Sequence, residues 1–189
     1  MQIRWLSCLL IVLALLNGCA SHAPPKTEQR PAQADAPFAF NGRVAIKHDG
    51  ERSSAGLRWA HSLEKDELLL LAPLGQTVAS IRRDAQGVTM DASGKQYVAQ
   101  DVEALTHRVL GWALPLSGLR YWVIALPKNG SEADIQRDAN GQITVLRQDG
   151  WEINYSRYAT TAADSLPLRF VLRREHLEIM VVIDEWEAQ

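Results

Sequence analysis

The sequence is poor in the residues that most enzymes and metalloproteins need. Its five histidines are scattered without metal-ligand spacing, and it has no H-E-x-x-H motif, G-x-S-x-G elbow or glycine-rich phosphate loop. The acidic residues Glu64 and Asp66 fall at a predicted turn, where we expect solvated surface residues rather than a general acid. The sequence therefore predicts a protein that is not an enzyme and that holds no metal or cofactor.

The chain also lacks a basic excess and a long apolar run. Residues 6–16 are almost wholly apolar, but this run is too short for a comfortable membrane span. With Arg4 before it and Asn17-Gly18 after it, the run has the features of a secretory signal peptide. Removal of residues 1–18 takes away one arginine and no acid, which changes the formal net charge from −2 to −3. This charge argues against a nucleic-acid-binding protein.

Cysteine is scarce, and its positions indicate a lipid anchor. The stretch Leu16-Asn17-Gly18-Cys19 resembles a bacterial lipobox, in which cleavage falls before the cysteine and the thiol is acylated. Because Cys8 lies in the removed segment, Cys19 is the one cysteine of the mature chain and cannot form an internal disulfide. We expect Cys19 to carry an S-diacylglycerol and an N-acyl group. The alternative is an ordinary secretory signal with an incidental cysteine.

The residues after Cys19 predict where the anchor lies and how far the domain stands from it. Ala20 and Ser21 follow the cysteine, without the aspartate that commonly retains Gram-negative lipoproteins at the inner membrane, so we expect the outer membrane. The stretch to Pro37 holds four prolines and no large apolar residue, which is typical of an extended tether. The chain therefore divides into a signal peptide (1–18), a lipidated cysteine and tether (19–37), and a domain (38–189).

From Phe38 onward, apolar residues alternate with polar ones, the pattern of half-buried antiparallel strands. Ser93-Gly94, Asn140-Gly141 and Asp149-Gly150 are hairpin turn sequences. The alternation is interrupted by two helical patterns, at residues 101–111 and 115–127. Asp101 is placed to cap the first helix and Gly111 to end it, and Pro127 to end the second.

These patterns predict about eleven strands with a helical insertion after the sixth. A meander of this length must curl, so we expect an unclosed antiparallel β-barrel whose concave face is covered by the helices. Such a sheet encloses more volume than its own side chains fill. Five of the six tryptophans lie in the domain. We expect most of them to pack in the hydrophobic core; the alternative is that some line a cavity.

An unusual run of leucines leads into a turn in the middle of the domain. Residues 68–71 are four leucines, a strand apolar on both faces, one of which borders the predicted cavity. Leu74 follows between Pro73 and Gly75, two chain-reversal residues, which places its apolar side chain at a loop tip. Two outcomes stay open for Leu74: exposure at the tip, or packing back onto the neighbouring strands.

The order of these motifs resembles the LolB family of outer-membrane lipoprotein receptors. Each motif is weak alone, but together they cover nearly the whole mature domain in a specific order and spacing. They are Phe40–Ala45, Leu57–Trp59, Leu68–Gly75, Gly94–Tyr97, Leu114–Leu116, Leu119–Trp122, Leu126-Pro127, Gln148–Trp151 and Leu166-Pro167.

The resemblance implies a function as well as the same unclosed barrel. Members accept acylated lipoproteins from the periplasmic carrier LolA and insert them into outer-membrane lipid, and the leucine matching Leu74 belongs to the membrane-delivery step. We accordingly expect a monomer on the outer membrane that faces the periplasm, with Pro73, Leu74 and Gly75 as its delivery loop. The candidate lining of the acyl cavity is Phe40, Trp59, Leu68, Leu70, Trp112, Trp122, Trp151 and Tyr155. The alternatives are a scaffolding outer-membrane lipoprotein without a cavity and an enzyme acting on lipid.

Overall fold

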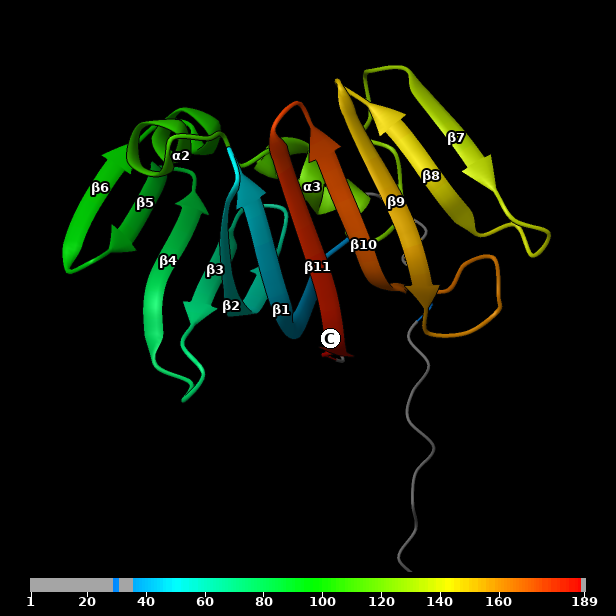
Figure 1. The fold of residues 1–189 in the computed structure, drawn as a ribbon, viewed down its shortest axis with the longest axis horizontal. Helices are drawn as coiled ribbons and strands as arrows, with labels where there is room; N and C mark the ends of the chain where they lie inside the picture. Colours follow the sequence, from blue (N-terminus) through cyan, green and yellow to red (C-terminus); the bar gives the residue numbers. More distant parts are fainter. Residues whose placement is uncertain (1–28, 31–35, 188–189) are drawn as a thin grey trace, which may run out of the picture.

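The computed structural model describes residues 29–30 and 36–187, and in this part of the chain eleven antiparallel strands form one curled sheet (Figure 1). Two helices are inserted between the sixth and seventh strands, so the predicted fold class and element order are confirmed. The elements are β1 (Phe38–His48), β2 (Glu51–His61), β3 (Asp66–Leu71), β4 (Thr77–Asp84), β5 (Gly87–Ala92), β6 (Lys95–Ala99), α2 (Val102–Leu110), α3 (Leu116–Trp122), β7 (Ala133–Arg137), β8 (Ile143–Gln148), β9 (Trp151–Tyr158), β10 (Pro167–Arg174) and β11 (Leu177–Trp186).

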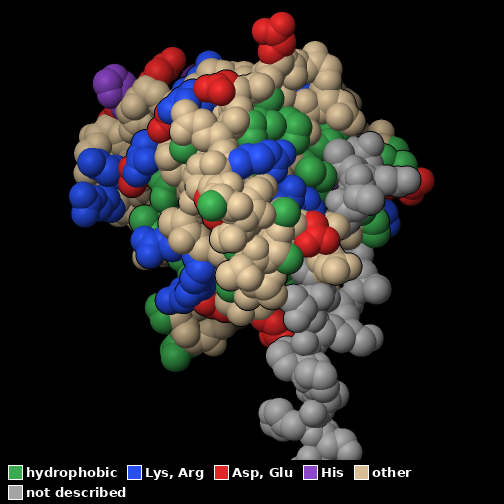
Figure 2. All heavy atoms as spheres, turned by 90° about the vertical axis from the view of Figure 1, so that its right-hand side faces the viewer, with side chains coloured by type: hydrophobic (Ala, Val, Ile, Leu, Met, Phe, Trp, Pro, Cys, Tyr) green, Lys and Arg blue, Asp and Glu red, His purple; other side chains and the backbone are tan. Residues whose placement is uncertain are grey.

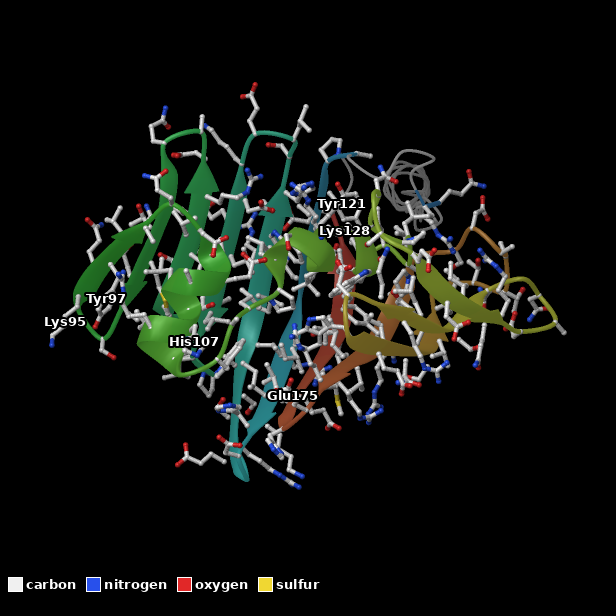
Figure 3. The ribbon with its side chains drawn as sticks, turned by 90° about the horizontal axis from the view of Figure 1, so that it is seen from above. Lys95, Tyr97, His107, Tyr121, Lys128 and Glu175 are labelled. Carbon is white, nitrogen blue, oxygen red and sulfur yellow. The ribbon has the colours of Figure 1, made fainter. Side chains whose placement is uncertain are left out.

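The strand order explains why the helices lie where they do. The order is β6-β5-β4-β3-β2-β1-β11-β10-β9-β8-β7, so the first and last strands of the chain pair in the middle of the sheet. Within the described residues the edge strands β6 and β7 do not pair with each other, which leaves the barrel unclosed. The chain must therefore cross from one edge of the curled sheet to the other between β6 and β7. The two helices form this crossing and lie over one face of the sheet (Figures 1 and 3).

Helix α2 begins and ends at the residues that the sequence predicts. The Asp101 carboxylate accepts a hydrogen bond of 2.7 Å from the backbone N–H of Ala104, which satisfies one of the free donors of the first turn. Gly111 adopts a left-handed φ of 82° and ends the helix. Val102 and Leu105 are buried against the sheet side, so the helix is held by its apolar face.

Helix α3 is shorter than predicted. It ends at Trp122, five residues before the proline that was expected to end it. Beyond it, the N–H of Leu126 bonds back to the carbonyl of Tyr121, and Ala125 takes a left-handed φ of 54°. This backbone turn ends the helix before Pro127 can act.

The core lies between the concave face of the sheet and the helices. Alternate residues of the strands point into it, because successive side chains of a strand face opposite sides. Along β10 and β11 these are Phe170, Leu172, Ile179, Val181 and Ile183, each at most 3% exposed. Full burial of such side chains stabilises the fold by about 1.5–3 kcal/mol each. The middle of the sheet is therefore firmly packed where the helices cross it.

Two residues of the predicted tether contact the domain. Gln29 forms a bridge with Ser165 in the β9–β10 loop, and Arg30 donates to the carbonyls of Asp164 (2.7 Å, from the backbone) and Ala163 (2.8 Å, from the guanidinium). Burial lowers the pKa of the Arg30 guanidinium. The signal peptide and the predicted lipidation site Cys19 lie outside the described residues.

The convex side of the sheet carries several ion pairs. Arg147 of β8 pairs with Asp134 (3.0 Å) and Glu152 (2.8 Å), and Arg43 of β1 pairs with Asp184 (2.8 Å). Figure 2, which views the molecule from the β7 side, shows lysine and arginine side chains gathered along one edge of this face. No helix within residues 36–187 has both the length and the apolar character needed to cross a membrane.

Candidate functional site

An apolar cavity of about 370 Å³ lies between the sheet and the helices. This volume is within the range of small-molecule sites. Its walls come from β1 to β5, from β10 and β11, and from the segment that carries the helices. The lining residues are Phe40, Val44, Ile46, His48, Glu51, Arg52, Ser53, Leu57, Trp59, Leu68, Leu70, Ala79, Ser80, Ile81, Met90, Ala92, Leu110, Trp112, Leu114, Leu119, Val123, Phe170, Ile179 and Val181.

The alternation along β2 sets the direction of the cavity. Ser53, Ala55, Leu57 and Trp59 share the inward face, and burial increases along this series, from an exposed Ser53 to a Trp59 that is 1% exposed. We call the surroundings of Trp59 the deep end. The open end, which we call the rim, consists of His48, Glu51, Arg52, Ser53, Leu110 and Trp112. The cavity therefore runs from an apolar deep end to a rim beside the β1–β2 hairpin.

Five of the eight residues that the sequence proposes for the lining are brought together here: Phe40, Trp59, Leu68, Leu70 and Trp112. Leu68 and Leu70 face the cavity, whereas Leu71 lines a separate groove on the convex side of the sheet. Only one face of the leucine strand thus borders the cavity, as expected. Contact of these residues with an acyl chain stays a prediction.

The other three proposed residues, Trp122 of α3 and Trp151 and Tyr155 of β9, do not line the cavity and contact one another between α3 and the sheet. The indole N–H of Trp122 donates to Gln148 over 3.0 Å, and its ring lies 6.3 Å from that of Trp151. The hydroxyl of Tyr155 donates to the carbonyl of Trp122 over 2.7 Å. Burial raises the pKa of Tyr155 well above its usual value, which keeps this donor protonated. These aromatic residues fix α3 to β8 and β9.

A buried polar cluster, which the sequence does not reveal, supports the deep end. Asp66 was expected at a solvated turn but is 2% exposed, and its carboxylate accepts from Trp59 (3.1 Å), His61 (2.7 Å) and Arg83 (2.6 Å). Burial by itself would raise the pKa of Asp66, but the hydrogen bonds and charges of His61 and Arg83 outweigh it and hold the pKa below its usual value. The signal that could have found this cluster is the pairing of His61 with Asp66 across a short turn.

The cluster does not have the composition of a metal centre. Among residues 29–30 and 36–187, no three His, Cys, Asp or Glu side chains are placed to hold a metal ion. Asp66 is instead neutralised by Arg83, whose Nε lies 2.6 Å from the carboxylate. Its role is to hold Trp59 in the cavity wall.

The loop between β3 and β4 carries the most exposed leucine among the described residues. Leu74 exposes 85% of its surface, as expected for a loop tip, and does not pack back onto the strands. The turn is closed by backbone hydrogen bonds from Gly75 to Ala72 (2.8 Å) and from Ala72 to Gln76 (2.9 Å). Gly75 adopts a φ of 84°, a conformation that favours glycine. A compact turn therefore holds Leu74 out in solvent.

The loop and the rim are related through the sheet topology. Strand β2 leads away from the β1–β2 hairpin and β3 returns beside it, with Gly56 opposite Leu71. The Leu74 loop and the hairpin therefore lie at the same ends of their strands. The curl of the sheet directs the loop away from the helices (Figure 1).

A family model described as outer membrane lipoprotein LolB matches residues 36–186. The chain belongs to the LolB family. A LolB protein of Chromobacterium violaceum is 42% identical over 181 residues, which cover 95% of this chain and 97% of the relative. A LolB protein of Nitrosomonas europaea is 36% identical, with 97% of this chain and 92% of the relative covered. The family resemblance predicted from the sequence is confirmed, and these LolB relatives are outer-membrane lipoproteins by name.

Solved structures that resemble this LolB family member are distant in sequence. A LolA superfamily protein of Nitrosomonas europaea gives a TM-score of 0.48 at 6% identity, with 82% of this chain and 87% of that chain covered. A putative outer-membrane lipoprotein-sorting protein domain from Vibrio parahaemolyticus gives a TM-score of 0.49 at 10% identity, with 85% and 88% covered.

Proposed function

We propose that this chain is an outer-membrane lipoprotein receptor, not an enzyme. In this function it faces the periplasm, accepts acylated lipoproteins from the periplasmic carrier LolA, holds their acyl chains in the cavity and inserts them into outer-membrane lipid. The cavity is the observation that carries this proposal, because its deep end is apolar and the polar atom that enters its wall, Trp59 Nε1, is bonded to Asp66. An acyl chain at the deep end therefore does not cover an unpaired indole N–H, because Trp59 keeps its hydrogen bond to Asp66.

The energetics of acyl chains explain why a receptor needs such a cavity. Exposure of each methylene to water costs about 0.8 kcal/mol, so one long chain costs on the order of 10 kcal/mol. Apolar walls such as Leu68, Met90 and Val123 offset this cost during transfer. The sequence has no glycine-rich phosphate loop, so the proposed transfer proceeds downhill from carrier to receptor to bilayer.

The Leu74 loop supports the last step of this proposal. A leucine that is 85% exposed adds little to folding, but it gains free energy when it enters the lipid interface. Contact of Leu74 with lipid would bring the β3–β4 end of the sheet to the membrane. Pro73 and Gly75 hold the turn, and Leu74 makes the contact.

The experiment that tests this function follows a lipoprotein from carrier to receptor. The anchored protein, in liposomes of outer-membrane phospholipid, is incubated with a radiolabelled lipoprotein bound to LolA, and the label is followed into the membrane fraction. We expect transfer that depends on the receptor. Cargo that never leaves the carrier would reject the proposal.

The rival readings are less favoured. A scaffolding lipoprotein needs no acyl cavity, and neither the cavity nor the family membership supports that role. Hydrolysis of acyl esters by the purified protein would be the result that revives an enzyme.

A further inference from the structure

The two ends of the cavity differ in their hydrogen-bond donors. At the deep end, the indole N–H of Trp59 is bonded to the Asp66 carboxylate over 3.1 Å. At the rim, the Ser53 hydroxyl and the Trp112 indole N–H make no hydrogen bond to any other residue of the described chain. The Trp112 nitrogen is also not among the buried unpaired atoms of this part of the chain, so it reaches solvent.

A third polar side chain, His48, completes this arrangement. His48 ends β1 on the inward face and pairs across the hairpin with Glu51, which is also at the rim. Its Nε2 lies 3.6 Å from the Asp49 carboxylate, a contact longer than a hydrogen bond. Figure 3 shows α2, with His107 labelled, and the β10–β11 hairpin, with Glu175 labelled, on the same side of the molecule as the β1–β2 hairpin.

The length of the cavity wall indicates which part of a bound acyl chain lies beside the donors of the rim. Trp59 lies six positions after Ser53 on the inward face of β2, a span of about 20 Å at roughly 3.3 Å per residue. One acyl layer of a bilayer is about 15 Å thick, half of the hydrocarbon core. A chain of this length whose carbonyl end lies at Ser53 therefore has its tail just beyond Leu57, in the buried part of the wall.

The head of an acylated cysteine is rich in acceptors and has no cation. Its glycerol carries two ester carbonyls, and its nitrogen is acylated, which adds an amide carbonyl and removes the positive charge. We propose that His48, Ser53 and Trp112 form a donor collar that hydrogen-bonds to these ester and amide carbonyls when the acyl chains enter the cavity. This inference rests on the proposed function and adds to it a recognition element for the lipid head.

The first arm of the test changes the ligand and leaves the protein intact. Two synthetic lipopeptides with equal chain lengths are compared, a tripalmitoyl-cysteinyl-serine and its analogue in which both glycerol esters are replaced by ethers. Affinity is measured by displacement of a fluorescent alkyl probe from the full chain. Because one or two net hydrogen bonds are lost, we expect the ether analogue to bind about tenfold more weakly.

The second arm removes the donors and keeps the shape. In the triple variant His48→Phe, Ser53→Ala and Trp112→Phe, which removes all three donors of the collar, the preference for the ester should fall to about one. The control is Ser54→Ala, next along β2, which lines the convex groove and should keep the full preference. Circular dichroism verifies that the variants fold.

The possible outcomes distinguish failure of the donor collar from failure of the proposed function. If the parent binds the ester and the ether lipopeptides equally well, the donor collar is wrong but the acyl cavity is not. The same conclusion follows if Ser54→Ala loses as much of the ester preference as the collar variant. If neither lipopeptide displaces the probe from the parent, the proposed function itself fails.

Discussion

The indole N–H of Trp59 and the imidazole Nδ1 of His61 share one carboxylate oxygen of Asp66, at 3.1 and 2.7 Å. The depressed pKa of Asp66 means that its carboxylate is ionised and only accepts, so His61 holds a proton on Nδ1. Arg83 binds the second oxygen over 2.6 Å. The ionised carboxylate of Asp66 thus orients Trp59, a residue of the cavity wall.

Loss of this carboxylate should destabilise the domain. In Asp66→Ala, three buried or half-buried donors lose their acceptor, and we expect a loss of about 3–5 kcal/mol in the free energy of unfolding. Urea denaturation followed by circular dichroism measures this loss. The matched control is Asp184→Ala, which removes the exposed partner of Arg43 and should cost at most about 1 kcal/mol. Equal losses in the two variants would contradict the role assigned to Asp66.

The same carboxylate predicts an acid-sensitive component of stability. Because the folded-state pKa of Asp66 lies below its unfolded value of about 3.9, its stabilising contribution is fully present above that pH. The contribution is lost as the pH falls through the folded-state pKa. The difference in urea midpoint between the parent and Asp66→Asn should therefore be largest above pH 5 and shrink on acidification. A difference that stays constant down to pH 2.5 would show that the ionised form contributes nothing.

A charge in the cavity should abolish acyl binding, whereas the same charge one residue away should not. Leu70 lines the cavity, and Leu69 is equally half-buried but faces the other side of β3. We expect Leu70→Glu to weaken binding of a fluorescent alkyl probe at least tenfold, because an acyl chain would have to cover a carboxylate. Leu69→Glu should bind within about twofold of the parent. Similar affinities for both variants would place the acyl chain elsewhere.

Leu74 should matter for delivery and not for folding. We expect Leu74→Glu to unfold within about 0.5 kcal/mol of the parent, since an exposed side chain loses little packing. The variant should accept lipoprotein from the carrier and fail to release it into liposomes, because a carboxylate disfavours entry into the lipid interface. Retention of labelled cargo on the receptor, measured by liposome flotation, reports this step.

The control for Leu74 is provided by another exposed leucine. Leu63 is 66% exposed in the turn between β2 and β3, at the opposite strand ends from Leu74. Leu63→Glu should deliver cargo as the parent does. If Leu74→Glu unfolds, or delivers as well as Leu63→Glu, the proposed membrane contact is wrong.

Local chemistry explains which parts of the fold can be predicted from the sequence. Ser93-Gly94 and Asp149-Gly150 form their hairpins with positive φ at both residues, and Asp101 caps α2, because turn and cap preferences depend on a few adjacent residues. The early end of α3 depends on a backbone turn at Ala125, which the helical spacing of its apolar residues does not encode.

The division of the aromatic residues could not be predicted in the same way. Alternation places Trp59 and Trp151 alike on the inward face of the sheet. Only the path of α3 decides that the ring of Trp151 lies against Trp122, while Trp59 faces open space. Asp66 was missed for a related reason, since its partner Arg83 comes from the next strand and is distant in sequence.

The bridge between Gln29 and Ser165 would shorten the tether of a domain that is anchored at Cys19 as the sequence predicts. Covalent geometry allows the ten residues from Cys19 to Gln29 to span at most about 36 Å, against about 65 Å for the eighteen to Pro37. Effective concentration falls roughly as the −3/2 power of linker length. A linker of ten residues in place of eighteen would therefore raise the local concentration of the domain at the membrane about twofold. For the proposed receptor, this contact of the predicted tether would therefore raise the frequency with which the domain meets the membrane.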